Sequence, residues 1–369
     1  MEVNVSFAAL DPYVETNIIE PTEKPVNGKE FIAWGDGNKY PEYLFGLYQD
    51  VTSLRTICNG IADYIVGENV ITNYPDVIDD EENLIHKLGL DLSIYGGFAL
   101  QVRRGVDGKV KKIQYLNIKN VRSNKSNTRY YYSEDWNKSY GRVQYVDYPA
   151  FEGDVKYIED PKTKERLLIA TSIYVYKSSH NMVYPSPLYA GDGCVAAETE
   201  KAIAQYHLNA INNGFAGSYI VNMCNGVPED AQKKEIEENF REKFTGYKNA
   251  GRPVLVWSKS KDNKTTIEKV ESEDFGDRYN ALSKNSKQEI YSAFRAHPVI
   301  FGLPTQDTGF NDQDFKEAFK LFNKTVIQPM QKKICNAFDN ILGVQNTITI
   351  EPFQIDWTDD TDNNTETVS

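Results

Sequence analysis

Three observations predict a mixed α+β fold for this chain of 369 residues. Apolar residues recur at helical spacing in two N-terminal segments, at about 53–66 and 81–95. A block rich in alternating Tyr, Val and Ile then runs from 98 to 176 and predicts antiparallel strands. Long helical patterns follow at about 188–213, 277–296 and 312–342. Strands and helices segregated into blocks are typical of α+β proteins.

The composition is that of a globular chain able to bury a sizeable core, with 40% hydrophobic and 12% aromatic residues. The formal net charge of -12 disfavours a protein that wraps DNA on a basic surface, but not one that lets DNA pass without gripping it. The four cysteines form no CxxC pair and suit reduced, buried thiols. No segment resembles a signal peptide or approaches the roughly 20 apolar residues that span a bilayer. We therefore expect a soluble protein, made in the cytoplasm, that contacts no membrane.

The N-terminal half begins with residues 1–30, which are polar and proline-containing and suggest an extended arm. A turn cluster from Trp34 to Leu44 leads into the first helix, which Gly67 is expected to end. The strand block contains six segments separated by Gly, Asp and Asn. Within it, the Asp-Gly pair of Val106–Lys109 predicts a hairpin turn.

The C-terminal half begins where "YPSPLYAGDG" interrupts the strands. The helix from about Leu188 to Asn213 is rich in small residues, which permit close helix neighbours or simply reflect the helix propensity of alanine. An α/β insert follows, with a charged helix expected at 229–244 between strands. A helix from about Asp277 to Ala296 then leads away from the insert.

A polar loop precedes the last long helix and is longer than a reversal of direction requires. It follows "FGLP" and contains no Lys or Arg. Asn311 or Asp312 can cap the helix. Pro329 lies within the helix and predicts a kink, because proline has no N–H to offer the carbonyl four residues earlier.

Three lysines recur at steps of four on that helix, on the face away from its phenylalanines: Lys316, Lys320 and Lys324. One interpretation is an ordinary solvated helix face. The other is a basic stripe that touches phosphates lightly. The residues alone leave both interpretations open.

The sequence offers little support for catalysis. It has no GxxxxGK[ST] phosphate loop, no GxSxG and no HExxH, and its four histidines fall in separate elements. Two GDG triplets, at 35–37 and 191–193, suit turns better than contacts to a phosphate or metal. We predict no catalytic residue, no metal site and no cofactor, and we do not expect an enzyme.

The order of several segments resembles a known family. These segments are Ser186–Leu188 opening a long helix, "NNGF" (212–215) closing it, "GRPVLVW" in the insert, "EIYSAFRAHPVIFGLP" (289–304), "NKTVIQPMQKKI" (323–334) and "SIYGGFALQV" (93–102). Together they resemble the portal proteins of tailed double-stranded DNA bacteriophages, the head-to-tail connectors of the type paired with HK97-fold capsids.

The resemblance implies a portal fold with an α/β wing, an antiparallel helical stem, a small α/β clip and a long kinked tunnel helix. The implied parts are the wing at 1–185, stem helix 1 at 186–215, the clip at 216–275, stem helix 2 at 276–299, the tunnel loop, kinked helix and closing wing strand at 300–355, and an acidic tail at 356–369. A C-terminal crown of helices is expected to be reduced or absent.

The resemblance also implies a function. Portal proteins form a ring, usually a dodecamer, at one capsid vertex of the virion, through which double-stranded DNA is packaged and ejected. Implied partners are the large terminase subunit, a head-tail adaptor and the major capsid protein, with assembly in the host cytoplasm. The residues implied to form the tunnel loop are Thr305, Gln306, Asp307, Thr308, Gly309 and Asn311. The alternatives are another oligomeric phage structural protein, such as a capsid or baseplate component, and a nucleic-acid hydrolase.

Overall fold

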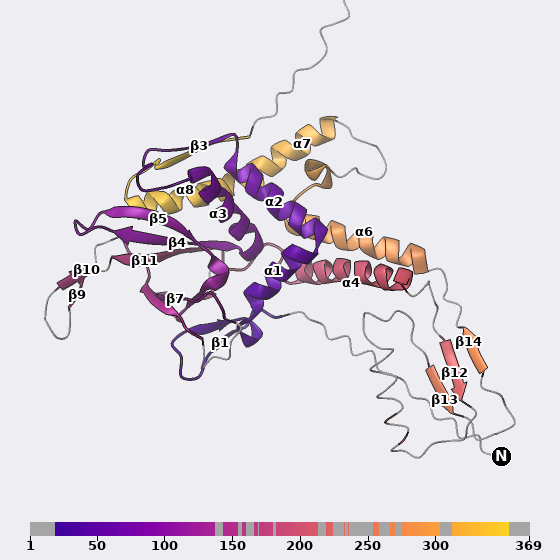
Figure 1. Cartoon of the computed structure of the whole chain (residues 1–369). Coiled ribbons are helices and arrows are strands. Elements are labelled where there is room, and N and C mark those ends of the chain that lie inside the picture. The colour runs from indigo at the N-terminus through magenta and orange to yellow at the C-terminus, as the bar shows by residue number, and fades with distance from the viewer. Residues whose placement is uncertain are drawn as a thin grey trace, which may run out of the picture. The chain divides into compact units, whose positions relative to one another are not determined.

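The computed structural model divides into two compact units, each containing helices and strands (Figure 1). The first comprises residues 19–190 and the chain from 291 onward, and the second comprises 191–290. The α+β class is therefore confirmed. The structure describes residues 19–136, 143–153, 157–159, 166–168, 170–179, 182–212, 219–223, 232, 235, 254–257, 266–269, 275–302 and 312–353.

Two helices lie at the centre of the first unit. α2 (Thr52–Val66) and α3 (Glu81–Tyr95) pack against each other through apolar residues at helical spacing. Gly89 of α3 permits this approach, because a Cβ atom there would lie 3.2 Å from the Ile65 side chain. Gly67 ends α2 in a backbone conformation with φ of 71° that favours glycine. Both predicted helices and this end are confirmed.

The segment expected to be only a turn cluster contains a further helix. η1 (Asp36–Asn38) forms the turn, and α1 (Tyr40–Asp50) follows directly. Pro41 occupies the first turn of α1, where a missing N–H forfeits no helical hydrogen bond. A helix of three turns with two buried leucines gives too weak a periodic signal to be recognised from spacing.

The main sheet of the first unit has the order β11-β4-β5 and is antiparallel throughout. β4 (Gly97–Arg104) lies between β5 (Val110–Leu116) and β11 (Thr171–Lys177). Its apolar side chains are buried on both faces, and α3 packs against it. The predicted hairpin turn joins β4 to β5, and Gly108 has the positive φ, 75°, that such a turn requires.

Smaller strand pairs complete this part of the unit. They are β1 (Glu23–Pro25) with β2 (Ile32–Trp34), the sheet of β6 (Val121–Ser123), β7 (Arg129–Tyr132) and β8 (Val146–Pro149), and β9 (Tyr157–Glu159) with β10 (Arg166–Leu168). Two expectations need correction. Part of the supposed arm, residues 23–25, is paired as β1, and the strand expected over 166–177 is divided into β10 and β11.

The C-terminal chain returns to the first unit. η3 (Pro298–Phe301) precedes residues 303–311, which lie outside the described part of the chain. A continuous helix follows, formed by α7 (Asp312–Phe322), the π-helical segment η4 (Asn323–Ile327) and α8 (Gln328–Leu342). The closing strand β15 (Ile348–Glu351) pairs with β3 (Asn69–Thr72), as an antiparallel two-stranded ribbon. The predicted helix at 312–342 and the closing strand are confirmed.

Pro329 affects this helix through η4. In a regular α-helix its ring would crowd the carbonyl of Thr325 and its missing N–H would leave that carbonyl without a helical donor. In η4 the N–H of Gln328 instead bonds the carbonyl of Asn323, five residues earlier. The Thr325 hydroxyl donates to the Leu321 carbonyl at 2.7 Å. The proline is therefore accommodated by a π-helical turn on its N-terminal side.

Five aromatic rings, which we call the Tyr64 cluster, connect these C-terminal elements to α2. Tyr64 lies edge-on to Phe301 of η3 at 6.3 Å, to Phe319 and Phe322 of α7 at 5.6 and 6.3 Å, and to Phe353 at 5.7 Å between ring centroids. Edge-to-face contacts at these distances are favourable. One residue of α2 thus contacts the chain on both sides of residues 303–311.

Two further contacts hold the same elements. The Tyr64 hydroxyl donates to the Ile300 carbonyl at 3.0 Å, and the Gln331 side chain of α8 donates to the Ile65 carbonyl near the end of α2 at 3.0 Å. Gly60 makes room for the Phe301 ring, since a Cβ atom there would lie 2.5 Å from it. These two hydrogen bonds and the space left by Gly60 therefore hold the Tyr64 cluster in place.

The second unit contains two long helices and a small sheet. α4 (Asp192–Asn212) and α6 (Phe275–Ala293) run antiparallel, and Tyr206 stacks on Tyr279 with ring centroids 4.5 Å apart (Figure 1). α4 begins four residues later than predicted, because the chain before it forms a turn. The sheet has the order β13-β12-β14, formed by β12 (Tyr219–Met223), parallel to β13 (Val254–Trp257) and antiparallel to β14 (Thr266–Lys269). The charged helix expected at 229–244 lies outside the described residues, except for two helical positions at 232 and 235.

Asp91 generates the first prediction, because α3 places its carboxyl group inside the core. Burial raises the pKa of Asp91 to about 8, although hydrogen bonds from Tyr115 and the Ile118 backbone act in the opposite direction. The folded state thus binds this proton more tightly than the unfolded state. Stability is greatest below the unfolded pKa near 4 and falls, by up to about 1.4 kcal/mol per pH unit, as the pH rises to about 8.

We therefore expect Asp91→Asn to flatten the decline in unfolding free energy between pH 5 and pH 8. Urea titrations at several pH values measure this directly. The matched control is Asp76→Asn, an exposed aspartate, which should retain the wild-type slope. An unchanged slope in Asp91→Asn would show that this carboxyl group does not govern the decline.

The Tyr64 cluster generates the second prediction. Phe322 is 1% exposed, so Phe322→Ala should leave a cavity and lower the unfolding free energy by about 3–5 kcal/mol. Its neighbour Leu321 is 65% exposed, and Leu321→Ala should change stability by less than about 0.5 kcal/mol. Urea denaturation followed by tyrosine and tryptophan fluorescence compares the two. Equal effects would contradict the packing described here.

Candidate nucleic-acid interface

The chain before residues 303–311 is fixed up to Gly302. His297 caps η3, its Nδ1 atom accepting the N–H of Val299 at 3.3 Å, and Gly302 ends η3 with φ of 74°. The chain after the segment is fixed by α7. The predicted tunnel-loop residues, Thr305, Gln306, Asp307, Thr308, Gly309 and Asn311, lie outside the described residues. The structure therefore describes both attachment points of this loop, and its residue assignments remain predictions.

α7 separates its apolar and charged residues. Phe319 and Phe322 are buried in the Tyr64 cluster, whereas Lys320 is exposed and Lys316 is partly buried; Lys324, in the adjoining η4, is also exposed. The helix therefore brings two of the three predicted lysines fully to solvent. Burial shows which side of α7 is covered, and it is the side with the aromatic rings.

The exposed side of α7 is mixed rather than uniformly basic. Glu317 is exposed there and accepts a hydrogen bond from Gln313 at 2.8 Å, and Leu321 is exposed between two lysines. Such a face offers a phosphate two mobile ammonium groups without a rigid array of donors. Lysine acts on phosphate as a flexible point charge, so contacts to this face would be weak and readily exchanged.

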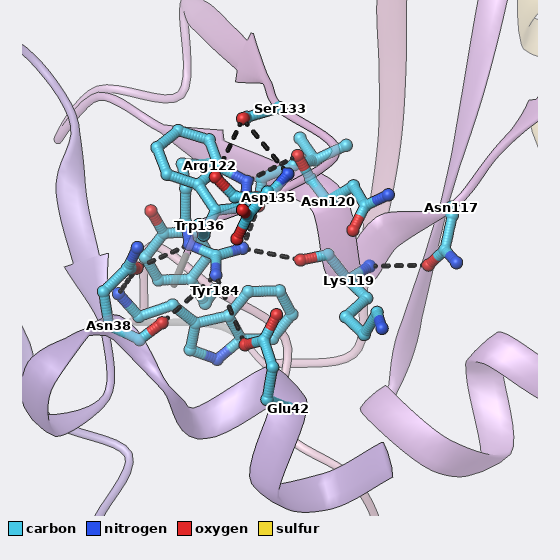
Figure 2. A network of polar contacts seen from close by, with 12 residues as sticks. Asn38, Glu42, Asn117, Lys119, Asn120, Arg122, Ser133, Asp135, Trp136 and Tyr184 are labelled. Carbon is cyan, nitrogen blue, oxygen red and sulfur yellow. Dashed lines mark hydrogen bonds and ion pairs between the residues drawn. The ribbon is translucent and has the colours of Figure 1, made fainter. Parts of the chain in front are cut away.

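A buried arginine organises the other side of the first unit, and sequence reasoning missed it (Figure 2). Arg122 of β6 is fully buried, and its guanidinium group lies 5.7 and 4.9 Å from the ring centroids of Trp34 and Trp136. It donates to the carbonyl oxygens of Lys119 at 2.7 Å and Asn38 at 3.2 Å. Aromatic faces and carbonyl oxygens thus replace the water lost on burial.

This arrangement joins η1 and α1 to β6. The Glu42 carboxylate of α1 lies 3.9 Å from the guanidinium group and offsets its charge. Asn38 adopts a left-handed conformation with φ of 64°, which turns its side chain toward Arg122. The turn interpretation of the triplet at 35–37 is thereby confirmed. The glycine-rich turn at 35–37 was the only sequence signal near this arrangement. Nothing in the sequence connects that turn to Arg122, more than 80 positions later.

The described residues contain little that suggests catalysis. They include no group of three or more potential metal ligands. His86 pairs with Asp63 at 3.1 Å and His207 lies beside Tyr279, while His180 falls outside the described part. Burial raises the pKa of the Cys335 thiol to about 11 and that of Cys58 still further, so neither forms the reactive thiolate at neutral pH. Within the same residues, no helix has the length and apolar character of a membrane span.

Comparison of sequences places the chain in a family. The family model described as "Phage portal protein" matches residues 69–366. An uncharacterized protein of Rickettsia bellii is 27% identical over 221 residues, which cover 58% of this chain and 52% of that protein. One from Rickettsia felis is 30% identical over 131 residues, covering 34% and 30%. The aligned part of the chain thus spans about half or less of these curated relatives.

Comparison of structures shows the same fold. A chain from the virion of a native gene transfer agent particle aligns with a TM-score of 0.51 at 16% identity, covering 85% of this chain and 84% of that one. A chain from the neck of the empty particle, computed with C6 symmetry, aligns with a TM-score of 0.51 at 17% identity, covering 91% and 87%. An HK97 family portal protein from Corynebacterium diphtheriae aligns with a TM-score of 0.48 at 8% identity, covering 83% and 93%.

The family match carries the assignment, because it covers well over half of the chain, from β3 to beyond β15. The two structural matches with a TM-score of 0.51 agree with it at the level of fold. Portal proteins are structural components of virions, and the expected family is confirmed. The chain belongs to the phage portal protein family.

Proposed function

We propose that copies of this chain form a closed ring, a dodecamer, at one vertex of a capsid, and that double-stranded DNA is packaged and ejected through its centre. Membership of the portal family supports this proposal most directly. The related fold in a particle neck computed with C6 symmetry agrees with a ring-shaped assembly.

The parts of the proposed ring follow the sequence divisions. The wing comprises residues 1–185 together with the closing segment of 300–355. The stem is an antiparallel pair of helices, at 186–215 and 276–299. The clip comprises residues 216–275. The antiparallel contact of α4 and α6 through Tyr206 and Tyr279 suits a stem. The strand trio β12–β14 suits a small clip between the two stem helices.

One observation gives the proposed channel its physical basis. The Tyr64 cluster anchors the chain on both sides of residues 303–311, so the loop between them can project without destabilising the fold. In the ring, this loop faces the DNA with hydroxyl and amide groups and no basic residue. Because few DNA phosphates are neutralised by Lys or Arg, the contacts to DNA are weak. Weak contacts suit a duplex that must move through the channel.

The remaining partners are assigned by the same proposal. The clip docks the large terminase subunit during packaging and a head-tail adaptor afterwards, while the wing contacts the major capsid protein. The protein assembles in the host cytoplasm and remains in the virion. The acidic tail, 356–369, has no assigned partner.

The direct test is the mass of the purified full-length protein, together with negative-stain images. A particle many times the 42.0 kDa subunit with a central hole wide enough for a duplex is the expected result. A monomer or dimer at micromolar concentration, or magnesium-dependent cleavage of DNA, would contradict the proposal. The second outcome would favour the hydrolase alternative.

Lys316 and Lys320 of α7 and Lys324 of η4 provide the third prediction. We propose that they form a band of positive charge around the channel. Replacing all three with glutamine should reduce the DNA retained in assembled particles several-fold, because each subunit loses its mobile contacts to phosphate. The measurement is the DNA content of purified particles at two salt concentrations.

The matched control replaces three exposed lysines elsewhere on the first unit, Lys24, Lys39 and Lys125, with glutamine. It changes the net charge equally but leaves α7 intact. Equal DNA retention in the two triple variants would mean that α7 is only a solvated helix face. Ring formation is measured in both, so that a loss of assembly is not mistaken for a loss of DNA contact.

A further inference from the structure

A cavity of about 920 Å³ opens in the first unit between α2, the start of α3 and η3. Among its lining residues, Val66 and Ile300 are buried, Tyr64 and Phe301 are partly buried, and Phe353 is 39% exposed. We call it the α2–α3 cavity. Its volume lies in the range of cavities that bind ligands, and its base is the aromatic surface of the Tyr64 cluster.

The opening of the α2–α3 cavity is acidic. Its exposed lining residues include three carboxylates, Asp63, Asp80 and Glu82. The Asp63 side chain is 71% exposed and its contact within the subunit is His86. An apolar base with an acidic rim suits a protruding apolar group with basic neighbours. It repels DNA, and it repels the chain's own C-terminal residues, which contain Asp and Glu but no Lys or Arg after Phe353.

The turn between β4 and β5 has the complementary character. Val106 at this turn is 99% exposed, more than any other large hydrophobic side chain in the described residues. Residues 103–112 contain five basic residues and one acidic residue, a net charge of +4 in a chain of net charge -12. Lys111 pairs with Asp107 at 2.9 Å and Lys112 pairs with Asp79, while Arg104 lies over the Phe151 ring. The exposed basic residues near Val106 are then Lys109 and Arg103, whose guanidinium group donates to the Gln101 side chain.

Hydrogen bonds within the β4–β5 turn also fix its conformation. The N–H of Gly105 bonds the Lys109 carbonyl at 2.9 Å, and the N–H of Gly108 bonds the Gly105 carbonyl at 2.9 Å. The Asp107 carboxylate accepts the N–H of Lys109 at 3.2 Å. A turn that is already ordered loses little conformational entropy when it binds, so its exposed valine can contribute fully to an interface.

We infer that the β4–β5 turn of one copy inserts Val106 into the α2–α3 cavity of the next copy. The inference rests on the proposed ring and names a contact that holds it together. The turn lies at the end of the main sheet away from α2 (Figure 1), so one copy presents the turn and the cavity as two different surfaces. Such a contact is head-to-tail, and a head-to-tail contact forms a ring when the rotation between successive copies closes.

Charge explains why the contact is needed. Copies with a net charge of -12 repel one another, so a contact that brings opposite charges together locally is favoured. Arg103 and Lys109 of one copy meet the carboxylates of the cavity in the next, while Val106 covers the aromatic base. The basic groups guide the approach and the apolar contact gives the affinity.

Cysteine cross-linking of the full-length protein tests the contact. Val106→Cys combined with Asn83→Cys, which lines the cavity, should give a ladder of covalent multimers with a short bismaleimide. The matched control combines Asn83→Cys with Val146→Cys, an exposed valine on β8 that is 53% exposed. Single-cysteine variants measure the background from native thiols. A ladder no stronger than that of the control pair overturns the inference.

A mixing experiment tests its head-to-tail character. Val106→Glu should lose ring formation but keep an intact cavity, and the double variant Asp63→Lys with Glu82→Lys should lose ring formation but keep an intact turn. To avoid a new attraction between the glutamate at 106 and the introduced lysines, the cavity variant used in the mixture is Thr56→Trp with Asn83→Trp, which fills the cavity. Mixed with Val106→Glu, it leaves one productive contact, and the mixture should form heterodimers and nothing larger. Thermal unfolding of each variant shows whether the fold is intact.

The two proposals fail in different ways. If the wild-type protein forms rings and Val106→Glu forms them equally well, the contact is wrong and the proposed function stands. If the wild-type protein forms no ring under any condition tested, the proposed function fails and the contact fails with it. If the separate variants form no rings and the mixture forms heterodimers, the result supports both the proposed contact and the proposed ring.

Discussion

The packing of four phenylalanines around Tyr64 is the constraint on which the rest of the first unit depends. Tyr64 belongs to α2, but its ring contacts η3, α7 and Phe353, which are more than 230 residues away along the chain. The cluster fixes the C-terminal helix, the closing strand and both attachment points of residues 303–311 to one helix. These anchors lie outside residues 303–311, whose sequence contains no Lys or Arg, and this composition suits the weak contact with DNA that the proposed channel needs.

Several elements could be read from the sequence because their signals are local. α2 and α3 have regular apolar spacing, and Gly67 marks the end of α2. Pro329 predicted a kink, and the structure shows the π-helical segment η4 before it, because a missing N–H alone does not say how the helix accommodates the proline. Arg122 could not be found, since a buried arginine requires partners that only the tertiary structure supplies. Phe319 and Phe322 could be recognised as part of the apolar face of the C-terminal helix. That this face packs against Tyr64 could not be read from the sequence.

The site shows the same limit. Sequence spacing placed Lys316, Lys320 and Lys324 on one side of the helix formed by α7 and η4, and burial agrees that the aromatic rings occupy the other. Spacing did not reveal that Lys316 is partly covered or that Glu317 dilutes the positive charge. These details matter for the proposed channel, because a face with two mobile ammonium groups and a carboxylate holds phosphate more weakly than a continuous basic stripe.

The proposed ring must be stable while its contacts to DNA stay weak, although both involve lysine and arginine. Salt weakens both kinds of charge pair, since charges separated by more than about 8 Å are largely screened at physiological ionic strength. The β4–β5 turn differs from α7 in having a wholly exposed valine at its centre and an aromatic cavity to receive it. Burial of apolar surface does not depend on ionic attraction, and salt tends to strengthen it. A ring joined by such a contact can therefore persist under conditions in which the lysines of α7 release a phosphate.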